Sequence, residues 1–86
     1  MNLTTEHVNI ALEIDRKFTE SEQKGNDYFF ILGEMSELMP KFKKLMDELS
    51  QNDFDQLSLQ FSGFYRFGKF LERVAAQIAS GEIKVP

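Results

Sequence analysis

The sequence predicts an all-α fold, a single helical domain (1–86) built as an antiparallel bundle of three helices over about 5–23, 27–50 and 53–80. Two observations predict it. Apolar residues recur at alternating spacings of three and four, which is the period of one helix face. Clusters of turn and capping residues, Gly25-Asn26-Asp27 and Ser50-Gln51-Asn52-Asp53, separate the segments. With 42% hydrophobic residues, the chain is not a disordered acidic tail.

The first helix is expected over about 5–23. Thr4 or Thr5 is the expected N-cap, because either hydroxyl can accept a hydrogen bond from a backbone N–H that has no partner in the first turn. Gly25 can end this helix, and Asp27 can cap the next one. Because this link is so short, we expect the second helix to turn back along the first.

The second helix, 27–50, has the most regular apolar pattern. Its spacing alternates between three and four through Tyr28, Ile31, Met35, Leu38, Phe42, Leu45 and Leu49. Pro40 lies in the middle, where it removes a hydrogen bond and clashes with the preceding turn. Because the pattern keeps its phase across Pro40, we expect one helix kinked near 36–40, with a break into two collinear pieces as the alternative.

The third helix, 53–80, shows a similar apolar stripe. It comprises Phe54, Leu57, Phe61, Phe64, Gly68, Leu71, Ala75 and Ile78, beside a second stripe of Phe67, Phe70 and Val74. Gly81 is the expected end of the helix, and the tail from Glu82 is expected to be extended. An alternative interpretation makes 57–61 a strand followed by a turn at Ser62-Gly63. We expect Gly68 to give room for a facing helix or ring, since glycine is unfavourable inside a helix.

Two motifs in the chain have possible chemical functions. Residues 63–69 read G-x-x-x-x-G-K, but the positions between the glycines are bulky, and Phe70 replaces the hydroxyl that a phosphate-binding loop needs for Mg²⁺. We therefore interpret this stretch as a helix containing two glycines. Arg66, Lys69 and Arg73 form a short basic stripe, which we expect to pair with acidic residues.

The remaining candidates for chemistry are weak. His7 stands alone, and we expect it to be a half-buried polar side chain and neither a metal ligand nor a general base. Glu34 and Glu37 share a helix face and could form a carboxylate pair, although surface carboxylates one turn apart are common. The chain has no Cys, which excludes disulfides and thiolate zinc sites. We therefore expect no catalytic residues, no metal, no cofactor and no enzymatic activity.

The aromatic residues give the main indication of function. Nine Phe and the run Tyr28-Phe29-Phe30 are more than a three-helix monomer is expected to bury. We therefore expect a protein interface formed by Tyr28, Phe29, Phe30, Phe64, Phe67, Gly68 and Phe70.

These observations predict a non-enzymatic protein–protein interaction module, a homodimer or an accessory or inhibitory subunit of a larger protein. The alternative is a carrier of a small apolar ligand in a cavity lined by Phe and Met between helices. The net charge of -4 argues against nucleic acid as a partner. No signal peptide or membrane span is recognisable, and we expect the protein to be cytoplasmic.

Overall fold

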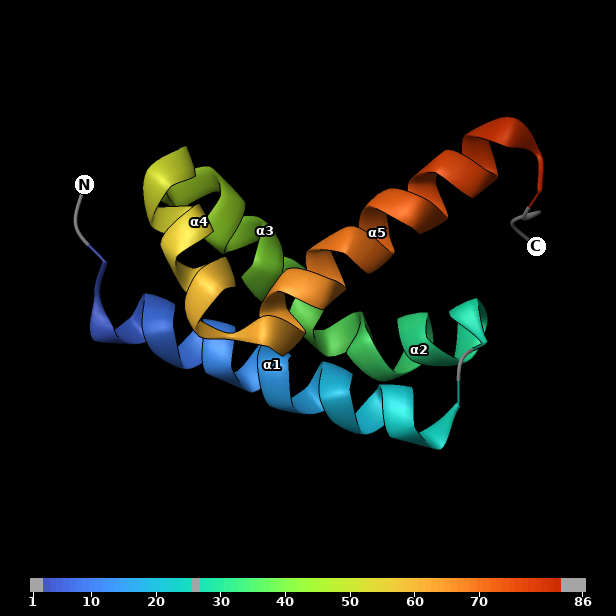
Figure 1. Cartoon of the computed structure of the whole chain (residues 1–86), viewed down its shortest axis with the longest axis horizontal. Helices are drawn as coiled ribbons and strands as arrows, with labels where there is room; N and C mark the ends of the chain where they lie inside the picture. Colours follow the sequence, from blue (N-terminus) through green and yellow to red (C-terminus); the bar gives the residue numbers. More distant parts are fainter. Residues whose placement is uncertain (1–2, 26, 83–86) are drawn as a thin grey trace.

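The structure, a computed structural model, describes residues 3–25 and 27–82, and this part of the chain is all-helical (Figure 1). The helices are α1 (Thr5–Lys24), α2 (Tyr28–Met35), α3 (Met39–Glu48), α4 (Gln51–Gln60) and α5 (Ser62–Ser80), with a 3-10 turn, Ser36–Leu38, between α2 and α3. The all-α fold class is confirmed, whereas the bundle of three helices is not. The tail expected to be extended lies, beyond Glu82, outside the described residues.

Helix α1 and the α2–α3 segment lie side by side and run in opposite directions, as the short link predicts (Figure 1). Residue numbers rise along α1 while those of the partners on α2 and α3 fall. The ion pairs that show this order are Glu6–Lys44 at 2.7 Å, Glu13–Lys41 at 2.9 Å and Lys24–Glu34 at 3.2 Å.

Side-chain caps begin three of the helices. Thr4 is the N-cap of α1: its hydroxyl accepts a hydrogen bond from the His7 backbone N–H, and its own N–H donates to Nδ1 of the His7 ring, both at 3.2 Å. This reciprocal pair is a capping box in which His occupies the position usually held by Glu or Gln. Asp27 caps α2, as predicted, and Ser50 caps α4.

Pro40 lies in the first turn of α3, where a missing backbone N–H costs no hydrogen bond. The 3-10 turn ends α2 just before it. Where one kinked helix was expected, the structure therefore has two α-helices joined by a 3-10 turn. The apolar pattern keeps its phase through this turn, since Ile31, Met35, Leu38, Phe42, Leu45 and Leu49 are all buried.

The expected continuous helix over 53–80 is not present. Helix α4 ends at Gln60, Phe61 adopts an extended backbone conformation, and α5 begins at Ser62. The alternative interpretation is also wrong, because residues 57–60 are helical and form no strand, and Ser62 and Gly63, which it assigned to a turn, begin α5. A contact with α1 compensates for the break: the Gly63 backbone N–H donates to Oδ1 of Asp15 at 2.6 Å, so Asp15 satisfies a backbone donor that has no intrahelical partner at the start of α5.

The break changes which stripe of α5 is buried. Phe64, Phe67, Phe70 and Val74 lie in the core, whereas Gly68 and Leu71 are half-buried and Ala75 and Ile78 are exposed. The predicted apolar stripe is therefore buried at Phe64 but not at the positions that follow it, Gly68, Leu71, Ala75 and Ile78. Because α5 starts anew at Ser62, its rotation about its own axis is independent of that of α4.

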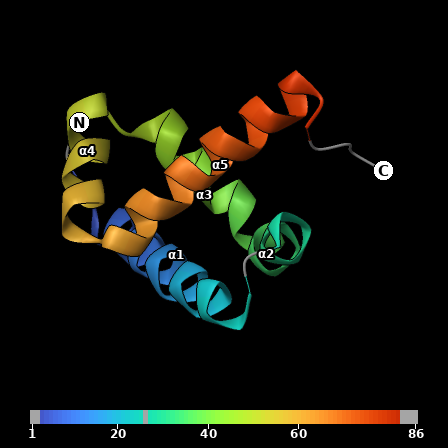
Figure 2. The same ribbon diagram turned by 45° about the vertical axis from the view of Figure 1, so that its right-hand side comes forward.

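The C-terminal half of α5 extends away from α2, and both views show the gap between the two ribbons (Figures 1 and 2). Most residues from Ala75 to Ser80 are exposed, and Gly81 ends the helix in the left-handed conformation, as predicted. The molecule measures 39 × 26 × 20 Å along its principal axes.

Candidate functional site

The residues predicted to form an interface divide into two groups. Phe64, Phe67 and Phe70 are buried in the core, and Gly68 is half-buried beside the ring of Phe42. In this structure these four residues pack within the chain and not on its surface. The physical reason is the break at Phe61, which turns the second stripe of α5 toward α1.

The three aromatic residues at the start of α2 lie at the surface. Tyr28 is half-buried and its ring centroid lies 5.7 Å from that of Phe70. Phe29 is 49% exposed and Phe30 is 41% exposed. They are the two exposed members of the nine Phe, so most of the phenylalanine excess seen in the sequence is buried or half-buried within the chain.

Helix α2 is apolar around most of its circumference but is buried along one side. Six of its eight residues are apolar, and two of them, Ile31 and Met35, are buried. Successive residues are rotated by about 100° around a helix. Gly33 therefore lies on the side of the helix opposite Ile31 and Met35, and Phe29 and Phe30 flank it. We call Phe29, Phe30 and Gly33 the α2 outer face.

The α2 outer face carries no charge. The single charged residue of α2 is Glu34, whose side chain reaches to α1 and accepts hydrogen bonds from Lys24 Nζ at 3.2 Å and Ser21 Oγ at 3.3 Å. The Lys24 ammonium holds the pKa of Glu34 below its ordinary value of 4.5. The charge of Glu34 is thereby directed toward α1 and away from the α2 outer face.

Gly33 has no role in packing within the chain. A Cβ added there would meet no atom within 4 Å, and no left-handed backbone conformation requires glycine. Glycine inside a helix destabilises it by about 1 kcal/mol relative to alanine. Nothing inside the described chain compensates for that loss.

A second exposed apolar region lies at the corner between α4 and α5. Leu59 is 87% exposed and lies beside Tyr65 and a mostly apolar groove of about 460 Å³, whose other lining residues are Asp55, Ser58 and Ser62. The other residues on this exposed side of α4 are polar: Asn52, Asp55, Gln56 and Gln60. A single exposed leucine among polar residues is common on protein surfaces.

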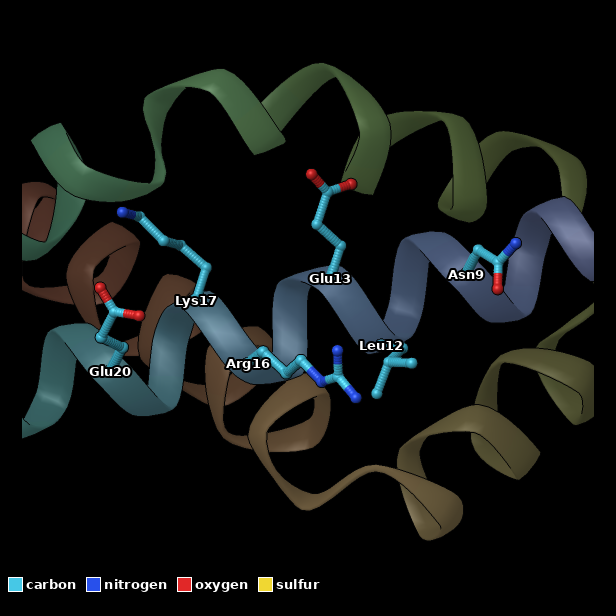
Figure 3. Close-up of a pocket in the computed structure, with 6 residues that line it drawn as sticks. All are labelled: Asn9, Leu12, Glu13, Arg16, Lys17 and Glu20. Carbon is cyan, nitrogen blue, oxygen red and sulfur yellow. The ribbon is translucent and has the colours of Figure 1, made fainter.

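Two of the other hollows in the described part of the chain lie along α1. One, of about 400 Å³, lies between α1, α2 and α5, with Phe18, Tyr28, Ile31 and Phe70 among its lining and Glu22 and Arg73 as its charged residues. The other, about 340 Å³, is a depression along α1 alone. Figure 3 shows that its side chains do not converge, since Glu13 points toward the α3 side and Arg16 points the opposite way.

The remaining predicted motifs have structural partners. Residues 63–69 are helical, which confirms the interpretation as a helix containing two glycines. Arg66 donates hydrogen bonds to Glu22 at 2.9 Å and to Thr19 Oγ1 at 3.0 Å on α1, and Lys69 pairs with Glu72 at 3.3 Å. These contacts confirm the expected pairing with acidic residues for Arg66 and Lys69 of the basic stripe.

His7 is more buried than expected, with 2% of its surface exposed. Its Nδ1 accepts the Thr4 backbone N–H, which leaves Nε2 as the donor to Glu48 Oε1 at 3.0 Å. Both ring nitrogens therefore make hydrogen bonds within the fold. The Glu48 partner, 41 residues away, could not be predicted from the sequence.

In the described ranges, no three His, Asp or Glu side chains gather as metal ligands would. Within the same ranges, no helix combines the length and apolar content needed to cross a membrane. Comparisons with protein-family models, curated proteins and solved structures found no match to this chain.

Proposed function

We propose that this chain is a non-enzymatic protein–protein interaction module that binds its partner through the α2 outer face. The observation that carries the proposal is that α2 is apolar over more of its surface than this chain buries, with Phe29 and Phe30 exposed. A helix with this composition is typical of the interior of a protein, so a partner surface that covers Phe29 and Phe30 would complete its burial.

The exposed rings have the character of interface anchors. Aromatic side chains are enriched in the centres of protein interfaces, where they bury a large apolar area. Phe29 and Phe30 project from a helix whose opposite side is fixed in the core by Ile31 and Met35. The α2 outer face is therefore presented by a rigid element, which reduces the entropy lost on binding.

The alternative, a carrier of an apolar ligand, has less support. The rings that were expected to line a cavity pack against one another: centroid distances are 5.1 Å for Phe42–Phe67, 5.1 Å for Phe54–Phe64 and 5.4 Å for Phe18–Phe67. Rings at such separations are in contact, so they leave no room for a ligand between them. The hollow between α1, α2 and α5 remains as the place for this alternative.

Site-specific photo-crosslinking tests the proposal. Phe29 is replaced by p-benzoylphenylalanine, and the chain is irradiated in the cells that naturally contain it. Tyr65 is the matched control position, because it is also aromatic and is also 49% exposed. We expect a covalent adduct with another polypeptide from position 29 at a yield at least about fivefold above that from position 65.

The proposal fails when position 29 yields no adduct, or yields no more than position 65. The mass of the adduct identifies the partner in the same experiment, since a second copy gives twice the mass of the chain. Native mass spectrometry of the purified protein tests the alternative, which predicts a bound small molecule.

A further inference from the structure

We infer that the hollow between α1, α2 and α5 binds a small monocarboxylate with an apolar tail, whose carboxylate pairs with the guanidinium of Arg73 while its tail lies against the rings of Tyr28 and Phe70. The hollow has a volume of about 400 Å³ and is lined by side chains from all three helices. The inference goes beyond the proposed function and does not depend on it, because the α2 outer face contributes none of the described side chains that line this hollow.

The floor of the hollow is apolar. It is formed by Phe18 on α1, Ile31 on α2 and Phe70 on α5, and each of these residues is at most 4% exposed. The half-buried Tyr28 also lines the hollow, and its ring centroid lies 5.7 Å from that of Phe70. Because the core fixes these side chains, the hollow is formed before a ligand binds, as is usual for small-molecule sites. An apolar tail placed there is removed from water.

The cation beside this floor is Arg73, the third residue of the basic stripe. The other two residues of the stripe pair with acidic side chains. Arg73 is exposed and lines the hollow, and it makes no ion pair within the part of the chain that the structure describes. It follows Phe70 by three residues, so the two lie on neighbouring turns of one face of α5. The structure therefore places an available guanidinium next to an apolar floor.

The charges around the hollow favour a ligand with one negative charge. Glu22 is the other charged residue of the lining, and its Oε1 accepts hydrogen bonds from Arg66, at 2.9 Å from Nη2 and at 3.1 Å from Nε. The charge of Glu22 is thereby balanced within the chain, whereas that of Arg73 is not balanced by a described residue. A guanidinium matches a carboxylate in charge and in the geometry of two parallel hydrogen bonds. A phosphate dianion would bring a second negative charge close to Glu22.

The expected affinity is modest, because the Arg73 side chain is exposed and water screens its ion pairs. We expect a dissociation constant on the order of 1 mM at low salt.

A titration of the ¹⁵N-labelled full chain with sodium octanoate, followed by backbone amide chemical shifts, tests the inference. The octanoate concentration runs from about 0.1 to 10 mM in about 20 mM NaCl, where screening is weak. Arg73→Gln and Arg16→Gln are the matched variants, since each removes the charge of one exposed arginine. Arg16 lines the depression along α1 and not this hollow. Because both side chains are exposed, both variants are expected to fold, and far-UV circular dichroism checks this.

We expect saturable shifts that are largest around Ile31, Phe70 and Arg73. Arg73→Gln should raise the dissociation constant for octanoate by at least about fivefold, and Arg16→Gln should change it by less than about twofold. Absence of saturable shifts up to about 10 mM octanoate overturns the inference, and so does an equal effect of the two variants.

Two further ligands test the parts of the proposed ligand separately. Octanol has the same apolar tail without the charge, and inorganic phosphate has charge without the tail. Each should cause smaller shifts at these residues than octanoate at the same concentration of about 2 mM. Equal shifts with octanol would overturn the role of the carboxylate, and equal shifts with phosphate would overturn the role of the apolar tail.

Discussion

Replacing Gly63 by alanine tests the contact at the break in the predicted third helix. An added Cβ would lie 2.6 Å from the backbone oxygen of Asp15 and 2.8 Å from Thr19 Oγ1, so α5 and α1 would have to separate. That movement also lengthens the 2.6 Å hydrogen bond from the Gly63 N–H to the Asp15 carboxylate. Overpacking costs about 1–3 kcal/mol, and a hydrogen bond to a charged group contributes about 1.5–3 kcal/mol.

The gain in helix propensity on replacing glycine offsets up to about 1 kcal/mol of this loss. We therefore expect Gly63→Ala to lower the free energy of unfolding by about 2–4 kcal/mol, measured by urea denaturation followed by circular dichroism. Gly68→Ala is the control, and it should raise the free energy of unfolding by up to about 1 kcal/mol, because its Cβ makes an ordinary contact with Phe42. The reasoning is refuted when Gly63→Ala stays within about 0.5 kcal/mol of the wild type, or when Gly68→Ala is as destabilising.

Three further predictions concern His7, pH and salt. His7→Ala should lower the free energy of unfolding by about 2–4 kcal/mol. His7→Gln should lower it by only about 1 kcal/mol, because Gln retains the capping box with Thr4. Equal losses for the two variants in urea denaturation would contradict the role of His7 in the capping box. Lys24 and Lys44 hold the pKa values of Glu34 and Glu6 below 4.5, so the stabilisation is present above about pH 4.5 and is lost as the pH falls through the folded-state values. The urea concentration at the unfolding midpoint should therefore decrease as the pH is lowered from about 6 to 3, and Glu34→Gln should make that decrease smaller. A variant with the same decrease as the wild type would exclude the Lys24–Glu34 contact as the cause of the pH dependence. Raising NaCl from about 20 to 500 mM should reduce the dependence of the urea midpoint on pH, because salt screens the exposed ion pairs between α1 and the α2–α3 segment; an unchanged dependence would contradict this origin.

The second segment was predictable from the sequence because its buried positions depend on local periodicity. The alternating stripe from Ile31 to Leu49 is buried throughout, and the capping residue Asp27 and the proline at position 40 occupy the places their chemistry favours. The third segment was not predictable in the same way. Its break is stabilised by Asp15, which is 48 residues from Gly63, and the apolar spacing continues across Phe61 although the helix does not.

The candidate site was predicted in part. The run Tyr28-Phe29-Phe30 indicated exposed rings on α2, and Phe29 and Phe30 are exposed. Phe64, Phe67 and Phe70 could not be assigned to the core without knowing the rotation of α5. Gly33 was missed, although its position opposite the apolar stripe of α2 was a signal that the sequence contained.

The central claim, that the α2 outer face is the binding surface of this chain, is tested most directly by photo-crosslinking from position 29 in the cells that naturally contain the protein. We expect a covalent adduct with another polypeptide at a yield well above that from position 65, because Phe29 lies on the α2 outer face and Tyr65, which is equally exposed, does not. An adduct from position 65, with none from position 29, would contradict the claim.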